Sequence, residues 1–422
     1  MPSSRLELLM PAGSVTKMNL ALDYGADAVY LGPPLYSLRA RENDFQKEQL
    51  NDSIRQVHQR GKKAYVTLNI FARNRKIKPF TEDIHDYAAM KPDAFIMSDP
   101  GLISIVRDSH PEIPVHLSVQ ANCMNWQSVR FWQKSLGVER IILSRELSIT
   151  EIKEIKQRVP DIELEAFVHG SICIAYSGRC LLSSYMDKRD ANQGVCDNSC
   201  REKYKVYEKE FYIEDEQNDA GKLYEIDEDE HGTYILNAKD LCMIQHLDKL
   251  AEAGVISFKV EGRTKSEFYA AMVARSYRGA IDDVEAGRAI DPYWLNELQK
   301  LSNRGYHTAF MLENPRAEGQ NYVSSTVYNP DFKCVGVIKN ALAPNKIEVE
   351  IKNKLKAGEQ FQLIQPYNKS FETRVLSITD AEGNPRSEVH SGAGKFIIEL
   401  DRPLAHPQSA LLISGSTIGT KI

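Results

Sequence analysis

The segment Leu6–Ser14, LELLMPAGS, contains the unit from which the rest of the fold follows. Leu6–Met10 is an apolar run of strand length, and Pro-Ala-Gly interrupts it. Ser14 is a favoured N-cap residue for a helix that begins directly afterwards. The segment therefore predicts a strand, a short turn and a helix, which is the repeating unit of parallel α/β folds.

The same order of elements recurs through the first three hundred residues. Seven further apolar runs are expected to be strands: Ala28–Leu31, Lys63–Asn69, Ala94–Ser98, Val115–Gln120, Arg140–Ser144, Glu163–Val168 and Val255–Val260. Helical patterns lie between them, for example at Gln46–Arg60, Trp126–Ser135, Ile149–Gln157 and Ser266–Ala286. Eight strands that alternate with helices predict a closed (β/α)8 TIM-like barrel. A doubly wound open sheet is the alternative, but the Gly-rich fingerprint typical of that fold is missing here.

A second kind of pattern begins at about Gly319. Short alternating runs separated by Asn, Gly and Pro follow at Val335–Ile338, Ile347–Ile351, Gln360–Ile364, Lys395–Leu400 and Ala410–Ser414. Such runs are typical of a small antiparallel β-barrel or sandwich. We therefore predict two domains, a barrel over residues 1–318 and a β-barrel domain over residues 319–422.

Composition and charge narrow the class of protein. The 422 residues are 42% hydrophobic and 26% charged, as in ordinary soluble proteins. With no apolar run of about 18 residues and no signal-peptide layout, we expect a cytoplasmic protein without membrane contact. A net charge of −5 excludes a uniformly basic nucleic-acid binder. Acidic residues concentrate in residues 208–230, expected to be a solvated insertion, so a local RNA-binding face stays open.

Four of the seven cysteines fall in residues 165–201, EAFVHGSICIAYSGRCLLSSYMDKRDANQGVCDNSCR, after the expected seventh strand. They are Cys173, Cys180, Cys196 and Cys200, with the spacing Cys-x6-Cys-x15-Cys-x3-Cys. Thiolates at converging positions bind zinc or an iron–sulfur cluster. Only the last pair has the short spacing of a zinc knuckle, which tilts the prediction towards a [4Fe–4S] cluster without deciding it.

The other three cysteines are read differently. Cys242 is an alternative fourth ligand, because it follows the cysteine-rich segment in NAKDLCMI. Cys123 and Cys334 stand alone and are expected to be ordinary buried residues.

Polar side chains stand at or just past the C-terminal ends of the expected strands. They are Asn69, Asp99, Gln120, Arg145, Glu146, His169, Glu261 and Arg263. In a (β/α)8 barrel these ends share the face that carries the active site. A helix-capping role is the alternative for any one of them, as for Asp99 before Pro100.

Arginine and carboxylate side chains suggest the chemistry of this face. Four arginines, Arg39, Arg41, Arg145 and Arg263, are predicted to bind an anionic small molecule, because guanidinium groups bind carboxylates and phosphates bidentately. Salt bridges to neighbouring glutamates are the alternative. Asn69 and Gln120 are predicted as further substrate contacts. Candidates for proton transfer are Glu146, His169 and Glu261.

The cysteine-rich stretch EAFVHGSICIAYSGRCLLS resembles the signature of the collagenase-like peptidase family U32. Further motifs extend the resemblance over nearly the whole chain: ELLMPAGS, GADAVYLG, YSLRAR, FIMSDPGLI, HLSVQANCMNW, RIILSRELS, KRDANQG, NAKDL and KVEGRTKS. SVQAN, SRELS and KRDANQGVCDNSC are similar to the branch of this family that hydroxylates bacterial tRNA.

The resemblance implies a specific activity and cofactor. It implies formation of 5-hydroxyuridine at the wobble position of tRNA, with prephenate as the hydroxyl source in place of oxygen. An oxygen-sensitive [4Fe–4S] cluster would be held by the four cysteines that match the family motif: Cys173, Cys180, Cys196 and Cys200. The arginines would then hold prephenate while a flipped-out uridine enters the barrel, and the C-terminal domain would help to bind RNA.

Other functions remain as alternatives. A cysteine peptidase would use Cys173 with His169 as its base, although a cluster ligand could not serve as nucleophile. No HExxH or GxSxG motif supports another peptidase class. Hydroxylation of ribosomal RNA or of a quinone precursor, and a non-catalytic iron–sulfur RNA-binding role, are the remaining readings.

Overall fold

The computed structural model describes most of the chain. The described residues are 5–38, 45–172, 176–178, 238–313, 319, 332–366, 368–404 and 409–414, together with short strands between residues 212 and 233. The four candidate cluster ligands, Arg39, Arg41 and most of the acidic stretch 208–230 lie outside them. Within that stretch β8 (Tyr212–Glu214) pairs with β9 (Leu223–Glu225), and β10 (Glu228–Asp229) pairs with β11 (Gly232–Thr233).

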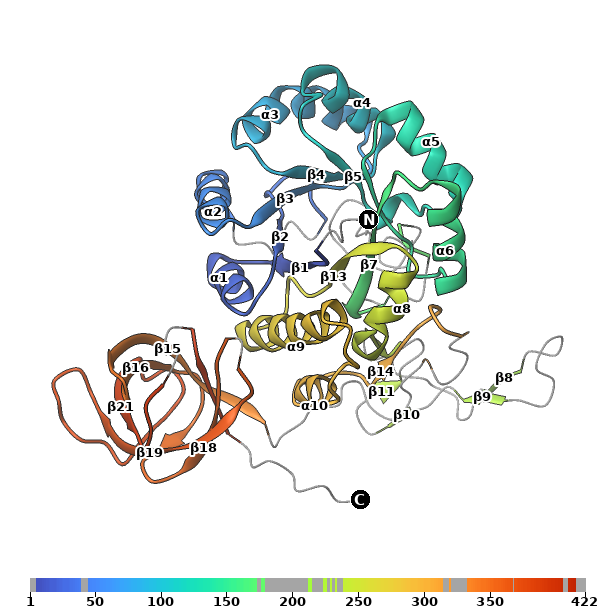
Figure 1. Cartoon of the computed structure of the whole chain (residues 1–422). Helices are drawn as coiled ribbons and strands as arrows, with labels where there is room; N and C mark the ends of the chain where they lie inside the picture. Colours follow the sequence, from blue (N-terminus) through green and yellow to red (C-terminus); the bar gives the residue numbers. More distant parts are fainter. Residues whose placement is uncertain are drawn as a thin grey trace.

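The first domain is a closed parallel barrel, as predicted (Figure 1). Its strands are β1 (Glu7–Ala12), β2 (Ala28–Leu31), β3 (Lys63–Leu68), β4 (Ala94–Met97), β5 (Val115–Leu117), β6 (Arg140–Ile142), β7 (Glu163–Gly170) and β13 (Val255–Val260). Each strand pairs with the next in parallel, and β13 closes the ring by pairing with both β7 and β1.

Helices cover the outside of the barrel. They are α1 (Val15–Asp23), α2 (Lys47–Gln59), α3 (Ile77–Ala89), α4 (Pro100–Ser109), α5 (Trp126–Leu136), α6 (Ile149–Arg158), α8 (Leu247–Glu252), α9 (Glu267–Glu285) and α10 (Tyr293–Leu298). Ser14 caps α1 by accepting a hydrogen bond from the Lys17 amide, as predicted, and Asp99 caps α4. Among the described residues, no helix has the length and apolar character needed to span a bilayer.

Two local predictions about this sheet were incomplete. The expected strand Val115–Gln120 ends at Leu117, because the Ser118 side chain accepts a hydrogen bond from the Gln120 amide and starts a 3-10 turn, η3 (Val119–Ala121). Two extra strands were missed. β12 (Asp240–Cys242) runs antiparallel to β7, and β14 (Tyr306–His307) extends the sheet beside it.

The second domain is the small antiparallel barrel that the sequence predicted. It closes in the order β15 (Lys333–Ala343), β16 (Lys346–Ile351), β21 (Lys395–Leu400), β19 (Phe371–Thr379), β18 (Gln360–Ile364) and β22 (Leu411–Ser414). β17 (Leu355–Lys356) pairs with β20 (Glu388–Val389). Strand β19, FETRVLSIT, was missed because its outward positions are polar and weaken the apolar signal. The predicted boundary between residues 318 and 319 falls between β14 and β15.

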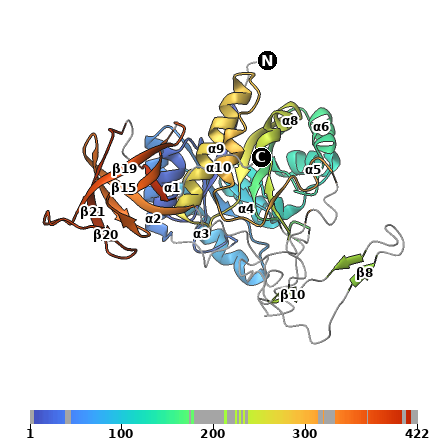
Figure 2. The same ribbon diagram turned by 90° about the horizontal axis from the view of Figure 1, so that it is seen from below.

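The two barrels are joined by specific polar contacts. The Tyr24 hydroxyl, at the end of α1, lies 3.0 Å from the Ile364 carbonyl oxygen and 2.9 Å from that of Ser409. Lys352 of the second barrel lies 3.6 Å from Glu267 of α9. Figures 1 and 2 show the second barrel beside α1 and α9, away from the axis of the first barrel.

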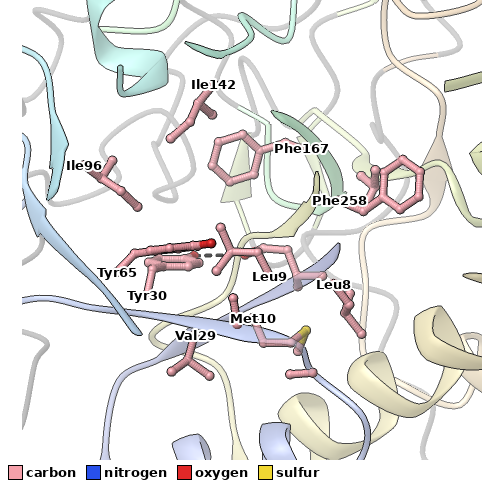
Figure 3. Packing of buried hydrophobic residues seen from close by; sticks show 14 of the residues in the cluster. Leu8, Leu9, Met10, Val29, Tyr30, Tyr65, Ile96, Ile142, Phe167 and Phe258 are labelled. Atoms are coloured by element: carbon pink, nitrogen blue, oxygen red, sulfur yellow. Dashed lines mark hydrogen bonds between the residues drawn. The ribbon is translucent and has the colours of Figure 1, made fainter. Parts of the chain in front are cut away.

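The interior of the first barrel contains an apolar layer. Figure 3 shows Leu9, Ile96, Ile142 and Phe167 pointing into it, together with the rings of Tyr30 and Tyr65. Leu8, Met10, Val29 and Phe258 point outwards and pack beneath the helices. The alternation along each strand thus builds two cores, one inside the barrel and one between the strands and helices.

Charged side chains also occupy the barrel interior. Arg140 Nη1 lies 2.6 Å from Glu7 Oε1 and 3.2 Å from Glu165 Oε2. Lys259 Nζ lies 2.8 Å from Glu165 Oε1, and Ser257 donates to Glu7 at 2.8 Å. We call Glu7, Arg140, Glu165 and Lys259 the interior ion network. Burial lowers the pKa of Lys259 from its usual value, and the Glu165 carboxylate opposes that shift.

Replacing Glu165 with Gln should destabilise the protein strongly. The substitution removes one carboxylate from between two buried cations, and breaking a buried pair in this way costs about 3–5 kcal/mol. Glu163→Gln is the matched control, because Glu163 contacts the same Arg140 at 2.8 Å but its side chain is 48% exposed. For an exposed pair we expect a loss of at most about 1 kcal/mol. Urea unfolding of both variants measures the difference, and equal losses would contradict this account.

Candidate active site

The floor of the barrel mouth is an aromatic layer with cations on it. Arg145 Cζ lies 4.0 Å from the centroid of the Phe167 ring. Lys259 Nζ lies 4.6 Å from the Tyr30 ring and 5.5 Å from the Phe167 ring. Arg263 Cζ lies 5.9 Å from the Tyr30 ring. Two rings therefore support three cations by cation–π attraction, and this floor presents positive charge beside apolar surface.

The end of β6 anchors the chain between two of the candidate cluster ligands. Arg145 donates to the Ser171 carbonyl oxygen at 3.0 Å. Glu146 Oε1 accepts hydrogen bonds from the Ser177 amide (3.0 Å) and hydroxyl (3.3 Å). Ser177 lies between Cys173 and Cys180 in the sequence. The cysteine-rich segment is thereby held at the mouth of the barrel.

Three consecutive residues at this strand end carry unsatisfied polar atoms. Ser144 Oγ, Arg145 Nε and Glu146 Oε2 are buried, and none has a hydrogen-bond partner among the described residues. A buried polar atom without a partner costs about 1–3 kcal/mol. Such atoms need an explanation, and a polar ligand that binds beside them would satisfy them.

Gln120 contributes to the same corner through its backbone. A Cβ atom at Gly178 would lie 2.1 Å from the Gln120 carbonyl oxygen, and Gly178 has a φ of +72°. Only glycine tolerates both the close approach and this conformation. Asn122 donates to the Ser177 carbonyl oxygen at 3.3 Å, so residues 176–178 are fixed from two sides.

A second corner holds the loop that leads to Arg39 and Arg41. Arg263 donates to Ser37 Oγ at 3.0 Å and to the Leu38 carbonyl oxygen. Asn69 Oδ1 accepts from the Leu38 amide at 3.0 Å, and Asn69 Nδ2 donates to Ser118 at 3.4 Å. Arg263 and Asn69 therefore position the residue that directly precedes Arg39.

His169 lies behind this floor in a cage of tyrosines. Its ring centroid is 5.8 Å from that of Tyr269 and 5.4 Å from those of Tyr277 and Tyr306. Its Nδ1 atom is 3.3 Å from the Tyr277 hydroxyl. Burial lowers the pKa of His169 to about 4, although Asp240 acts in the opposite direction. The imidazole is therefore neutral near pH 7 and shielded from solvent.

Glu261 links His169 to the end of β13 through the backbone. Its amide donates to the His169 carbonyl oxygen at 2.9 Å, and its own carbonyl accepts from the Tyr269 hydroxyl at 2.7 Å. A Cβ atom at Gly170 would lie 2.6 Å from that same carbonyl oxygen. The peptide of Glu261 is thus packed tightly between β7 and α9.

The described cysteines sit in buried surroundings. Cys242 Sγ is 3.8 Å from the Tyr277 hydroxyl, and burial raises the pKa of Cys242 to about 11. Burial likewise raises the pKa values of Cys123 and Cys334 to about 12. Because metals bind thiolates, these environments favour the four cysteines of residues 165–201 as the ligand set over one that includes Cys242.

The predicted residues thus fall into three groups. Gln120, Arg145 and Glu146 meet at one corner, Asn69 and Arg263 at the other, and His169 and Glu261 lie between β7, β13 and α9. Sequence reasoning missed Lys259, although the strand VISFKV carries a lysine at an inward position, which is a readable signal. It also missed the rings of Tyr30 and Phe167 as a floor, because aromatic residues in strands usually read as core.

Comparisons with known proteins place this site in a family. The model for peptidase family U32 matches residues 13–321, and that for the U32 C-terminal domain matches residues 330–410. "tRNA hydroxylation protein P" of Escherichia coli (strain K12) is 45% identical over 412 residues, which cover 90% of each chain. "tRNA hydroxylation protein P1" of Bacillus subtilis (strain 168) is 37% identical over 389 residues, 90% of this chain and 88% of the relative. A 23S rRNA 5-hydroxycytidine synthase of Escherichia coli (strain K12) is 32% identical over 282 residues, 67% of this chain and 40% of the relative.

Replacing His169 with Asn should reduce the loss of stability in acid. Since the folded pKa of about 4 lies below the unfolded value of about 6.5, protons bind the unfolded chain first. Stability is then lost as the pH falls from about 6.5 towards 4, by about 2 kcal/mol at about pH 5. The check is the free energy of unfolding in urea at about pH 7.5 and pH 5. In the variant the difference between the two pH values should shrink by this amount, and an unchanged difference would refute the assignment; exposed His390→Asn is the control.

Proposed function

This chain belongs to peptidase family U32, and from that premise we propose that it hydroxylates the wobble uridine of tRNA to 5-hydroxyuridine. The observation that carries the proposal is the pair of relatives named tRNA hydroxylation proteins, which are 45% and 37% identical over 90% of this chain. Both relatives are themselves covered almost fully, so they share the barrel and the C-terminal domain with this chain.

The proposed hydroxyl donor is prephenate, a dicarboxylate. A positively charged floor supports this choice, because Arg145, Lys259 and Arg263 lie on it and guanidinium groups pair well with carboxylates. The unsatisfied Arg145 Nε is a donor available to a ligand. Phe167 and Tyr30 supply apolar surface against which the ring of such a ligand can pack.

The proposed cofactor is a [4Fe–4S] cluster held by the four cysteines of residues 165–201. Four thiolates suit such a cluster, which would supply redox or Lewis-acid chemistry. The described part of this segment supports the location, since Ser177 is bonded to Glu146 at the mouth. Cys242 is set apart by its buried contact with Tyr277.

Among the candidates for proton transfer, the geometry favours Glu146. One of its oxygens binds Ser177 and the other, Oε2, has no partner among the described residues, so a substrate group could use it. His169 is enclosed by tyrosines, and with a pKa of about 4 it is a weak base. A proton acceptor works best with a pKa near the working pH.

Two alternatives fare less well on this geometry. A cysteine peptidase would pair Cys173 with His169 as base, but the Nδ1 atom of His169 faces the Tyr277 hydroxyl inside the cage. A non-catalytic RNA-binding protein has no need of the cationic floor or of the unsatisfied atoms beside it. Hydroxylation of ribosomal RNA is favoured by one observation, the 32% identical rRNA-modifying relative, which this chain covers over only 40% of its length.

Loss of the gene should abolish 5-hydroxyuridine and its derivatives in tRNA. Nucleosides from digested tRNA are measured by mass spectrometry in the deletion strain, with the wild-type gene and with Cys173→Ser. The wild type should restore the nucleosides and the variant should not, because it lacks a proposed cluster ligand. Cys334→Ser is the matched control and should restore them, since Cys334 lies in the second barrel.

The iron content and visible absorption of anaerobically purified protein give an independent readout. Cys173→Ser should lose both and Cys334→Ser should keep both. Unchanged tRNA in the deletion strain would sink the tRNA assignment, and ribosomal RNA from the same cells then becomes the next substrate to examine.

Arg145→Met should impair use of the anionic co-substrate without impairing tRNA binding. Methionine keeps apolar contact with Phe167 but removes the charged donor, and a lost hydrogen bond to a charged group costs about 1.5–3 kcal/mol, or roughly 10–100-fold in affinity. The measurement is the prephenate concentration needed for half-maximal hydroxylation, beside tRNA binding. Arg130→Met is the control, because Arg130 lies 4.9 Å from the Trp126 ring on α5. Equal effects of both variants would argue against a specific role for Arg145.

A further inference from the structure

A strongly basic loop connects β3 to α3. Residues 73–78 read RNRKIK and contain the short 3-10 turn η2 (Asn74–Lys76). We call Arg73, Arg75, Lys76 and Lys78 the rim cations. Arg73, Arg75 and Lys78 are exposed, and Lys76 is half-buried. Because the loop follows the C-terminal end of a barrel strand, it lies on the rim of the same mouth that carries the floor of Arg145 and Arg263.

Three of the rim cations are not neutralised by the protein. Within the part of the chain that the structure describes, no carboxylate lies within ion-pair distance of Arg75, Lys76 or Lys78, although Lys76 Nζ lies 5.9 Å from the Tyr36 ring. Burial lowers the pKa of Lys76, and the charge of Arg75 lowers it further. Lysines at the opposite end of β3 behave differently: Lys62 and Lys63 lie near Asp27 and Glu7, at 3.2 and 3.7 Å.

Local stability does not account for these cations. α3 begins directly after them, and its first turn has no acidic residue and no side-chain cap. Lys76 and Lys78 therefore stand at the positive end of the helix dipole, where cations are unfavourable. Side chains do cap other helices, such as Ser14 on α1 and Ser148 on α6. A sequence that opposes the local rule in this way indicates a functional requirement.

The loop is also held in place relative to the mouth. The Ala72 amide donates to Asp99 Oδ2 at 2.9 Å, and the Ile70 amide donates to the Tyr36 carbonyl oxygen at 3.2 Å. Asn69, which positions the loop before Arg39, comes just four residues before Arg73. The rim cations thus start from a fixed base, and their charges stay close to the entrance.

We propose that the rim cations bind successive phosphates of the RNA backbone beside the nucleotide that enters the barrel. This inference rests on the proposed function, because it takes RNA as the substrate. A nucleotide that enters base first leaves its sugar–phosphate backbone at the rim. Lysine and arginine side chains there fix the position of the strand without reading its sequence. The depth of the mouth separates two anions: the rim binds phosphates and the floor binds the small co-substrate.

The test is a triple variant, Arg75→Gln with Lys76→Gln and Lys78→Gln, in the full-length protein. Binding of an anticodon stem-loop RNA is measured as a function of salt concentration. Each lost phosphate contact removes about 0.7–0.9 from the slope of log affinity against log salt, so the slope should fall by about 2. Lys91→Gln with Lys134→Gln and Lys153→Gln is the matched control, since these lysines are exposed on helices or turns away from the rim and have no described ion pair.

The outcomes are distinct. A smaller slope in the rim variant alone supports the phosphate site. A slope unchanged from wild type, or an equal change in the control, overturns it, because the effect would then be absent or due only to net charge. Nucleoside analysis of cells complemented with the wild type decides the proposed function separately. Absent 5-hydroxyuridine in those cells together with a reduced slope in the rim variant would reject the uridine reaction and retain the RNA contact.

Discussion

Closure of the first barrel depends on buried charge. β13 joins β7 to β1, and each of these three strands contributes to the interior ion network, through Lys259, Glu165 and Glu7. Arg140 from β6 completes it. Well-packed apolar residues often stabilise a core as well as buried ion pairs do, so stability alone does not explain the network. Its position does, because the network holds Lys259 directly beneath the aromatic floor of the mouth.

Charge pairing changes along the axis of the barrel. At the lower end Glu7 accepts hydrogen bonds from Tyr65, Ser257 and Arg140, so its carboxylate is fully used. At the upper end Arg145 Nε and Glu146 Oε2 are buried without described partners. The same physical rule, that buried polar atoms need partners, is satisfied by the protein below and left for a ligand above. The site therefore begins where internal pairing stops.

The sequence allowed prediction of the parts that depend on local pattern. Strand period and the Ser14 cap placed the first β/α unit, and the repeat of that unit predicted the closed barrel. Contacts between distant strands were beyond the same reasoning. Glu7 and Arg140 look like polar residues at strand ends, and only the three-dimensional structure shows that both face inwards. Gln120 was assigned to a strand because the hydrogen bond of Ser118 that ends β5 leaves no trace in hydropathy.

A large and a small substrate make different demands on one barrel, and the arrangement of charge answers both. The small co-substrate needs a desolvated pocket, where few charges act strongly because the surroundings are apolar. Phe167 and Tyr30 give Arg145, Lys259 and Arg263 such surroundings. RNA needs exposed charge that can exchange with counterions, and the loop before α3 carries it. The second barrel is fixed beside α1 and α9 by Tyr24 and Lys352, off the axis of the first barrel (Figure 2), so neither layer of charge depends on its surface.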